Sequence, residues 1–265
     1  PVSLADEFAV IVNADATYSI GANDTVASIS GAGSINLNTF TLTVGDSNNQ
    51  IMSGLISGDG NLTKQGSGTL TLSGNNTYTG ATNIDAGALT VTGSLSDTTA
   101  VTVANDAVYN VNASDTVGSI AGGGLITTDS DGSKTLTAGG NNSDTEFSGV
   151  IADGSGRLSL VKAGTGALTL AGQNTYTGST SIAGGSLIIS GGMSDTAELT
   201  IGNGSTYTLG SDDRVGLISG GGSIDLSSFT LTSGNSSNSI FSGVISGSGG
   251  LVKVGSGSLT LAGDN

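Results

Sequence analysis

The chain has 265 residues, of which 46 are glycine and one is proline, and it contains no cysteine, histidine or tryptophan. Disulfides, imidazole or thiolate chemistry and structural zinc of the Cys/His type are therefore excluded. The formal net charge of −15 opposes binding to nucleic acid or to an anionic membrane surface, and no run of about 20 apolar residues is present to cross a bilayer.

Short runs of alternating apolar and polar residues begin near the N-terminal end and recur at close, even intervals along the chain. In the run Thr69–Leu72, the two leucines face one side of an extended chain and the two threonines face the other. Glycine, asparagine, aspartate and serine separate the runs, and no apolar stripe of helical periodicity is present. These features predict many short β-strands joined by turns, beginning with Ala9–Val12, Thr17–Ile20, Val26–Ile29, Ser34–Leu37 and Thr41–Val44.

A long internal repeat organises the chain. The stretch GTLTLSGNNTYTG at Gly68–Gly80 returns as GALTLAGQNTYTG at Gly166–Gly178 and, cut short, as GSLTLAGDN at Gly257–Asn265. Two further blocks, one around Thr17 and one around Met52, also occur three times. We therefore divide this single β-solenoid fragment into three copies of one unit, residues 9–99, 100–197 and 198–265, the last of them incomplete.

Repeats of this length favour a β-solenoid over a sandwich or a closed barrel. Gly68 and Gly166 are 98 residues apart, and Gly166 and Gly257 are 91 residues apart. With about 24 residues per coil, each copy is close to four coils, and the chain has about eleven coils in a rod about 50 Å long. Thr127–Lys134 is expected to be an insertion of about three residues in a turn. The near absence of proline fits strands that pair on both sides.

The longest motif is L-x-K-x-G-x-G-x-L-x-L-x-G-x-N-T-Y-T-G, at Leu62–Gly80 and Leu160–Gly178, and truncated at Leu251–Asn265. It resembles the autotransporter-associated β-strand repeat, also called the passenger-associated transport repeat, and the continuations at Thr82–Gly93 and Thr180–Gly191 match as well. The resemblance implies an all-β fold, a right-handed parallel β-helix, within a passenger that is secreted across a bacterial outer membrane.

The resemblance also implies an extracellular or cell-surface location, with attachment to the outer membrane through a translocator that these residues do not contain. Such passengers serve as adhesins, biofilm components or stalks. We therefore predict a structural stalk or display segment that is not an enzyme, has no cofactor or metal site and does not insert into a membrane. The implied partners are a host or cell-surface glycan or protein. Two alternatives stay open: a β-helical carbohydrate-active lyase or hydrolase, and a specific glycan- or protein-binding adhesin module.

A β-helical lyase or hydrolase needs clustered carboxylates, often beside an arginine or a lysine. The acidic pair with an adjacent base in this sequence is Asp212-Asp213-Arg214. The corresponding positions of the other copies keep one aspartate each, Asp24 and Asp115, which favours a turn role over catalysis. No catalytic residue is therefore assigned.

Lys64, Lys162 and Lys253 occupy one position of the unit, which favours a repeated structural contact with turn carbonyls or with an aspartate of a neighbouring coil. The five tyrosines occupy two positions of the unit, which favours packing. The stretch Asp129–Gly132 lacks the further ligands of a calcium loop, and strand propensity explains the outward threonine pairs without ice binding. No metal-binding or cofactor-binding residue is assigned.

The chain begins with Pro1 and stops inside the repeat motif, which favours a piece of a longer protein. The last coil, from about Leu251, would then lack a neighbour, and its inward residues Leu251, Leu259 and Leu261 are expected to be only partly covered. An uncovered strand edge of this kind predicts either a frayed C-terminal coil or end-on self-association.

Overall fold

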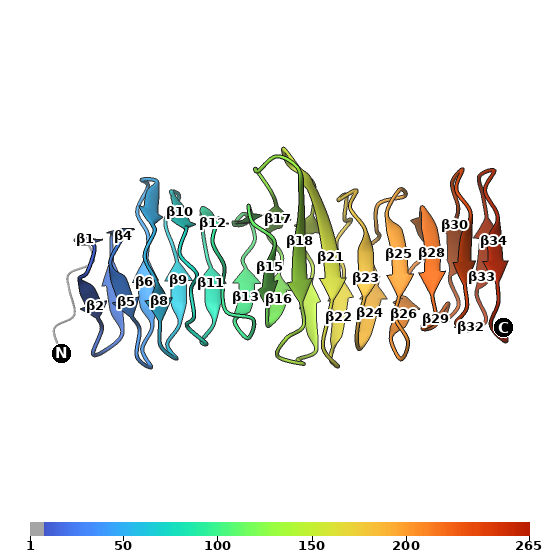
Figure 1. Ribbon diagram of the computed structural model, residues 1–265, viewed down its shortest axis with the longest axis horizontal. Helices are drawn as coiled ribbons and strands as arrows, with labels where there is room; N and C mark the ends of the chain where they lie inside the picture. The colour runs from blue at the N-terminus through green and yellow to red at the C-terminus, as the bar shows by residue number, and fades with distance from the viewer. Residues whose placement is uncertain (1–7) are drawn as a thin grey trace.

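The computed structural model of the protein describes residues 8–265, which form 34 β-strands and no helix. The strands wind into a solenoid of about 13 coils that lie side by side from the N-terminal end to the C-terminal end (Figure 1). All strand pairs are parallel, which confirms the predicted β-solenoid. Parallel crossovers are right-handed almost without exception, and this is the hand we expect here. Among residues 8–265 there is no long apolar helix of the kind that crosses a membrane.

Each coil places one segment on each of three faces, and the chain visits the faces in the order I, II, III. Face I contains an eight-stranded sheet and a three-stranded sheet: β1 Ala9–Val12, β4 Ser28–Gly31, β7 Gln50–Met52, β10 Thr69–Leu72, β12 Ala88–Val91, β14 Val108–Val111, β17 Leu125–Thr127 and β20 Val150–Ile151, then β27 Asp213–Val215, β30 Thr230–Ser233 and β33 Gly250–Lys253. Face II contains a three-stranded sheet and an eight-stranded sheet: β2 Thr17–Ser19, β5 Ser34–Asn36 and β8 Ile56–Ser57, then β15 Asp115–Val117, β18 Ser133–Ala138, β21 Arg157–Lys162, β23 Thr180–Ile182, β25 Glu198–Ile201, β28 Leu217–Gly220, β31 Ser239–Phe241 and β34 Leu259–Leu261.

Face III is one continuous sheet of 12 strands. Its strands are β3 Asp24–Val26, β6 Leu42–Val44, β9 Leu62–Lys64, β11 Thr82–Ile84, β13 Ala100–Val103, β16 Ser119–Gly122, β19 Thr145–Phe147, β22 Ala167–Leu170, β24 Ser186–Ile189, β26 Thr206–Leu209, β29 Ser223–Asp225 and β32 Val244–Ser246. Faces I and II are each interrupted where the chain makes only an isolated bridge, Gln173 with Gly192 on face I and Asn75 with Ser94 on face II.

The coil length follows from the register of the parallel strands. Leu42 pairs with Leu62, and Leu62 pairs with Thr82. The hydrogen bonds beside these pairs, from Asn61 to Thr41 and from Ala81 to Asn61, likewise join groups that are 20 residues apart in sequence. The expectation of about eleven coils is wrong because it assumes about 24 residues per coil. With strands about 4.8 Å apart, 13 coils give a rod roughly 60 Å long.

The core consists of like residues stacked in register along the rod. Leu70, Leu89, Tyr109, Ile126 and Ile151 follow one another on the inner side of face I, and each is at most 2% exposed. A parallel ladder aligns each residue with its partner on the next coil. Each apolar side chain of such a row is therefore covered by the side chains of the coils before and after it, except at the two ends of the rod. In the last coil, Leu251 and Leu259 are half-buried and Leu261 is 42% exposed, as expected.

The sequence repeat does not fill a whole number of coils. The strands that open the three proposed copies are β1, β13 and β25, and they lie on faces I, III and II respectively. From β1 to β12 there are 12 strands, and the segments that meet in the bridge between Asn75 and Ser94 fill two further positions. A copy therefore spans 14 positions on three faces, which is four and two-thirds coils and not the expected four. Equivalent residues of successive copies consequently lie on different faces.

The glycine of the repeated Ser-Gly-Leu/Val-Ile segment is required by the spacing of the coils. A Cβ added to Gly54, Gly149 or Gly243 would lie 1.7, 1.9 or 1.7 Å from a carbonyl oxygen of the preceding coil. No side chain fits at such a distance, so only glycine lets the backbones of adjacent coils approach here.

The rod widens in its middle, where β18 and β21 are six residues long and rise above the neighbouring coils (Figure 1). On face I, Leu125 of β17 pairs with Val150 of β20, so the chain between them forms a longer coil than those around it. The predicted insertion at Thr127–Lys134 covers the turn between β17 and β18 together with the end of β17 and the start of β18. This widening is the main departure from the regular repeat, and it positions the candidate site described below.

Candidate functional site

The repeated lysines are held in cradles of backbone carbonyls. Lys162 is 1% exposed, and its Nζ donates hydrogen bonds to the carbonyls of Ala163, Gly164 and Gly184 at 2.6, 3.2 and 3.2 Å. Gly184 belongs to the following coil, so Lys162 bonds two coils to each other. The structure thus bears out the predicted contact with turn carbonyls.

Lys64 makes the same three contacts, with the carbonyls of Gln65, Gly66 and Ala86. Burial lowers the pKa of both Lys64 and Lys162, and this is partly offset by Asp46 and Asp144 respectively. Lys253, in the last coil, is exposed and donates to two carbonyls, those of Val254 and Gly255.

Asparagine and aspartate side chains join the coils at a second set of positions. Asn76 accepts a hydrogen bond from the backbone N–H of Ile56, 20 residues earlier, and donates to the carbonyl of Ser94, 18 residues later. Two coils after Asn76, Asp115 accepts hydrogen bonds from the N–H groups of Leu95 and Thr116. Asn174 in the second copy and Asp213 in the third repeat this arrangement, and Asn265, also in the third copy, accepts from Ile245. These side chains pair backbone groups where the strand ladder of a face is interrupted.

The expectation that Asp24, Asp115 and Asp213 are turn residues is wrong. Each begins a strand, and they are 5, 7 and 8% exposed. A tyrosine hydroxyl lies against each carboxylate: Tyr18 donates to Asp24 and Tyr207 donates to Asp213, while the Tyr109 hydroxyl lowers the pKa of Asp115. The tyrosines at the second position, Tyr78 and Tyr176, bond instead to Thr82 and Thr180 at 2.5 and 2.6 Å. The four tyrosines other than Tyr18 are fully buried, in agreement with their predicted packing role.

The acidic pair Asp212-Asp213 does not form a joint site. Asp212 accepts a hydrogen bond from the N–H of Thr230 at 2.7 Å, whereas Asp213 points inward to Tyr207 and the N–H of Met193. Arg214 turns outward and forms a salt bridge of 3.7 Å with Asp195. Alternation along β27 therefore separates the groups that adjacency in the sequence had brought together.

Asp129 and Asp131 lie in the exposed turn before β18, and Lys134 Nζ donates to the backbone carbonyl of Asp131. Within residues 8–265, no three acidic side chains are placed to hold a metal ion together. The expectation that this turn binds no calcium stays a prediction.

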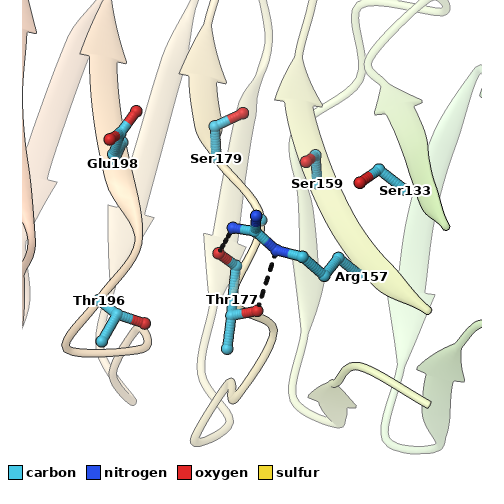
Figure 2. A pocket seen from close by; sticks show the side chains of 8 residues that line it. Ser133, Arg157, Ser159, Thr177, Ser179, Thr196 and Glu198 are labelled. Atoms are coloured by element: carbon cyan, nitrogen blue, oxygen red, sulfur yellow. Dashed lines mark hydrogen bonds between the residues drawn. The ribbon is translucent and has the colours of Figure 1, made fainter. Parts of the chain in front are cut away.

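The candidate site is a polar hollow of about 280 Å³ beside the widened coils. Its lining includes Ser159 on β21, Ser179 just before β23 and Glu198 on β25. Arg157, also on β21, lies below them in Figure 2. The exposed side chain of Arg157 reaches across to the next coil, and it donates to the Oγ1 and the backbone carbonyl of Thr177 at 3.3 and 2.5 Å. Hydroxyls, one carboxylate and one guanidinium thus share one open surface.

Asp153 fixes the other side of this arrangement. Its carboxylate accepts hydrogen bonds from the N–H and Oγ1 of Thr177 at 3.0 and 2.6 Å, and from the N–H of Leu158 at 2.8 Å. Thr177 therefore hydrogen-bonds both to the carboxylate of Asp153 and to the guanidinium of Arg157. Because Asp153 fixes Thr177, the guanidinium is oriented along the surface.

Arg157 lies outside the motifs that mark the repeat in the sequence. Asn61, Ser159 and Gly250 precede equivalent leucines in the three copies, and Arg157 lies two residues further upstream, in a stretch that lengthens β21. Arg157 could have been identified from the sequence because the stretch that contains it departs from the repeat.

Comparisons with known proteins agree with this architecture. Three stretches, residues 62–91, 160–189 and 251–265, match the model of the passenger-associated-transport-repeat family. Over 230 residues the chain is 36% identical to the adhesin BmaC autotransporter of Brucella suis biovar 1 (strain 1330). That alignment covers 77% of this chain but 6% of the adhesin, so the chain spans only a small part of that relative. No solved structure matches the chain significantly.

The fold and the comparisons together define a β-solenoid of the autotransporter-passenger class. The repeats that build it are passenger-associated transport repeats, as the lysine- and asparagine-containing motif had indicated.

Replacing Lys162 with methionine is expected to destabilise the fold by about 2–4 kcal/mol, because three partly buried carbonyls lose their shared donor. Replacing Lys253, which is exposed and has two acceptors, is the matched control and should cost less than about 1 kcal/mol. Urea unfolding followed by circular dichroism measures both. Equal losses for the two variants would contradict the cradle's contribution to stability.

Burial raises the pKa of Asp115 to about 6, assisted by the negative charge of Asp97 and opposed by its hydrogen bonds from the N–H groups of Leu95 and Thr116 and by the nearby Tyr109 hydroxyl. Between about pH 4 and pH 6 the folded state therefore binds more protons than the unfolded state, and stability falls as the pH rises through this window. Asp115→Asn removes this contribution, which is on the order of 2 kcal/mol.

Urea midpoints at pH 4.5 and pH 7 test this directly. The wild type should lose more stability than Asp115→Asn when the pH is raised. The exposed Asp129→Asn variant should behave like the wild type. If Asp115→Asn shows the same pH dependence as the wild type, Asp115 does not titrate in this range.

Proposed function

We propose that the chain is a structural stalk or display segment of a large secreted or surface-anchored bacterial protein with an adhesin-related role. The observation that carries this proposal is the uninterrupted stacking of coils over the described chain, with the lysine cradles and asparagine contacts repeated along it. In such an array each coil is stabilised by its neighbours, so length can be added without a new core. The similarity to an adhesin autotransporter supports the same role.

That similarity also supports an extracellular or cell-surface location. Attachment to the outer membrane through a translocator is part of the proposal, as is binding of the whole protein to a host or cell-surface molecule. A non-enzymatic role is favoured by the engagement of Asp115 and Asp213 with backbone N–H groups and by the separation of Asp212 from Asp213. The lyase or hydrolase alternative has no comparable observation in its favour.

A stalk should tolerate removal of one whole copy. Deleting residues 100–197 joins Thr99 to Glu198, so that β25 takes the position of β13 on face III and the alternation Ala-Val-Thr-Val is replaced by Glu-Leu-Thr-Ile. The shortened chain should keep its β-sheet spectrum and lose four and two-thirds coils, which is about 22 Å of length.

Small-angle X-ray scattering gives the maximum dimension of both chains. Deleting residues 100–187 instead ends inside β24, leaves two residues of that strand directly after Thr99 and serves as the control, which should misfold. Collapse of the in-phase variant to a compact particle, or equal behaviour of the two deletions, would contradict the stalk proposal.

A further inference from the structure

We infer that the edge between faces I and II, over the C-terminal half of the rod, is a binding groove for an extended glycan that carries spaced carboxylates. This goes beyond a stalk role, because it assigns a ligand class to one surface of the segment. The groove is defined by three hollows that share residues, and we call it the I–II groove.

The first hollow, about 280 Å³, is lined at one end by Gly132 and Ser133 and at the other by Gly156 and Arg157. Ser133 and Arg157 also line the second hollow, the candidate site of Figure 2. Thr196 joins the second hollow to a third of about 600 Å³, which continues past Arg214 to Gly255 and Ser256. All three lie where the chain passes from face I to face II.

The I–II groove therefore runs along the rod and not across it. It begins at the turn before β18 and ends at the turn after β33, six coil steps apart, which is about 29 Å. A single small molecule does not need such a length, whereas an oligomer of several units lying parallel to the rod axis fits it.

The cations of the chain are distributed unevenly. Lys64, Lys162 and Lys253 are committed to carbonyl cradles, and Lys134 donates to the carbonyl of Asp131. None of the four lysines lines the groove. The two arginines of the sequence, Arg157 and Arg214, both line the I–II groove, three coils apart. In a chain of net charge −15, both guanidinium groups thus lie on one edge.

Both arginines remain accessible to a ligand. Arg157 is exposed and spends its hydrogen bonds on Thr177 through Nε and one terminal nitrogen, which leaves the other terminal nitrogen open to the hollow (Figure 2). Arg214 is 52% exposed in its side chain, and its 3.7 Å ion pair with Asp195, which is 68% exposed, is of a kind that contributes little energy. A planar guanidinium in this state suits a carboxylate, which it binds in a bidentate manner.

The rest of the lining suits sugar hydroxyls. Ser133, Ser159 and Ser179 offer hydroxyls that both donate and accept. The carboxylates of Asp153, Glu198 and Asp195 offer acceptors for sugar hydroxyls. The ligand is held without stacking on aromatic rings, because the tyrosines of this half of the rod, Tyr176 and Tyr207, are fully buried. A polymer with a charge on every unit would be repelled by the acidic surface, so the carboxylates must be spaced.

The I–II groove also departs from the repeat in the way expected of a specialised surface. The copies put Asn23-Asp24-Thr25, Ser114-Asp115-Thr116 and Asp212-Asp213-Arg214 at one position, and only the third has a cation there. Packing of the coils accounts for the residues that recur in all copies, but it does not call for either arginine. Arg157 and Arg214 come from different positions of the unit, in the second and third copies. They lie on one edge of the rod because equivalent positions of these two copies lie on different faces.

The test uses the intact 265-residue chain and two hexasaccharide probes. The first alternates galacturonic acid with a neutral sugar, and the second is maltohexaose, which has no charge. Nuclear magnetic resonance titration at low millimolar ligand should show saturable binding of the first probe and at least tenfold weaker binding of the second. Arg157→Gln and Arg214→Gln should each weaken the acidic probe at least fivefold.

Ser47→Asp is the matched control, because it changes the net charge by the same amount at an exposed turn between faces III and I. It should alter the affinity less than twofold, and circular dichroism checks that every variant is folded. Equal binding of the two probes, unchanged affinity in both arginine variants, or equally strong binding of short single-stranded DNA would overturn the proposal. Absence of binding of the acidic probe at millimolar concentration would overturn it as well.

Discussion

The backbone of every inner coil must hydrogen-bond to a coil on each side at a spacing of about 4.8 Å, and the rest of the structure follows from this constraint. It excludes a side chain at Gly54, Gly149 and Gly243, where the next carbonyl lies within 1.9 Å of a Cβ position. It also leaves backbone groups unpaired wherever a turn or an interrupted face breaks the ladder. The buried ammonium of Lys162 and the amide of Asn174 pair these groups, and both do so between coils.

The polar residues of the repeat are therefore part of the core. Lys162 and Asn174 are as inaccessible as the leucines beside them, at 1 and 3% exposure. A buried charge is costly unless several hydrogen bonds compensate its lost hydration, and three carbonyls do so here. Because the acceptors come from two coils, the same contact stabilises the coil and fixes the register of its neighbour.

The phase of the repeat has a consequence for the outer surface. Fourteen strand positions on three faces turn each copy by a third of a revolution relative to the one before it, so that three copies restore the original orientation. One position of the unit illustrates this: it is Ile51 on face I, Glu146 on face III and Ile240 on face II. The same position thus points in three different directions from the rod axis. Equivalent residues of the copies therefore cannot form a row along one side of the rod. A surface that keeps the same chemical character along one side must come from residues that differ between copies, as Arg157 and Arg214 do.

Much of the fold could be predicted from the sequence because period-two alternation and self-similarity are written directly in it. The strand at Thr69–Leu72 and the contacts of the three lysines illustrate this. The coil length could not be obtained in this way, since turns and strands of a solenoid share glycine, serine and asparagine and a boundary between them leaves no mark. Arg157 was missed for a related reason: its importance depends on neighbours 20 residues away in sequence that only the register brings close.

The offset between paired strands of adjacent coils ranges from 17 residues (Thr17 with Ser34) to 25 (Leu125 with Val150), and between β7 and β10 it is 20. Paired cysteines can test this register, because the chain has no cysteine of its own. Ile51 and Thr71 are partners on adjacent coils of face I, and both point outward. In the variant with Ile51→Cys and Thr71→Cys, mild oxidation should give a rapid intramolecular disulfide. A chain with Ile51→Cys and Asn75→Cys, the pair that the longer coil of the sequence-based expectation would bring together, should stay reduced. A disulfide in the second variant and none in the first would contradict the account.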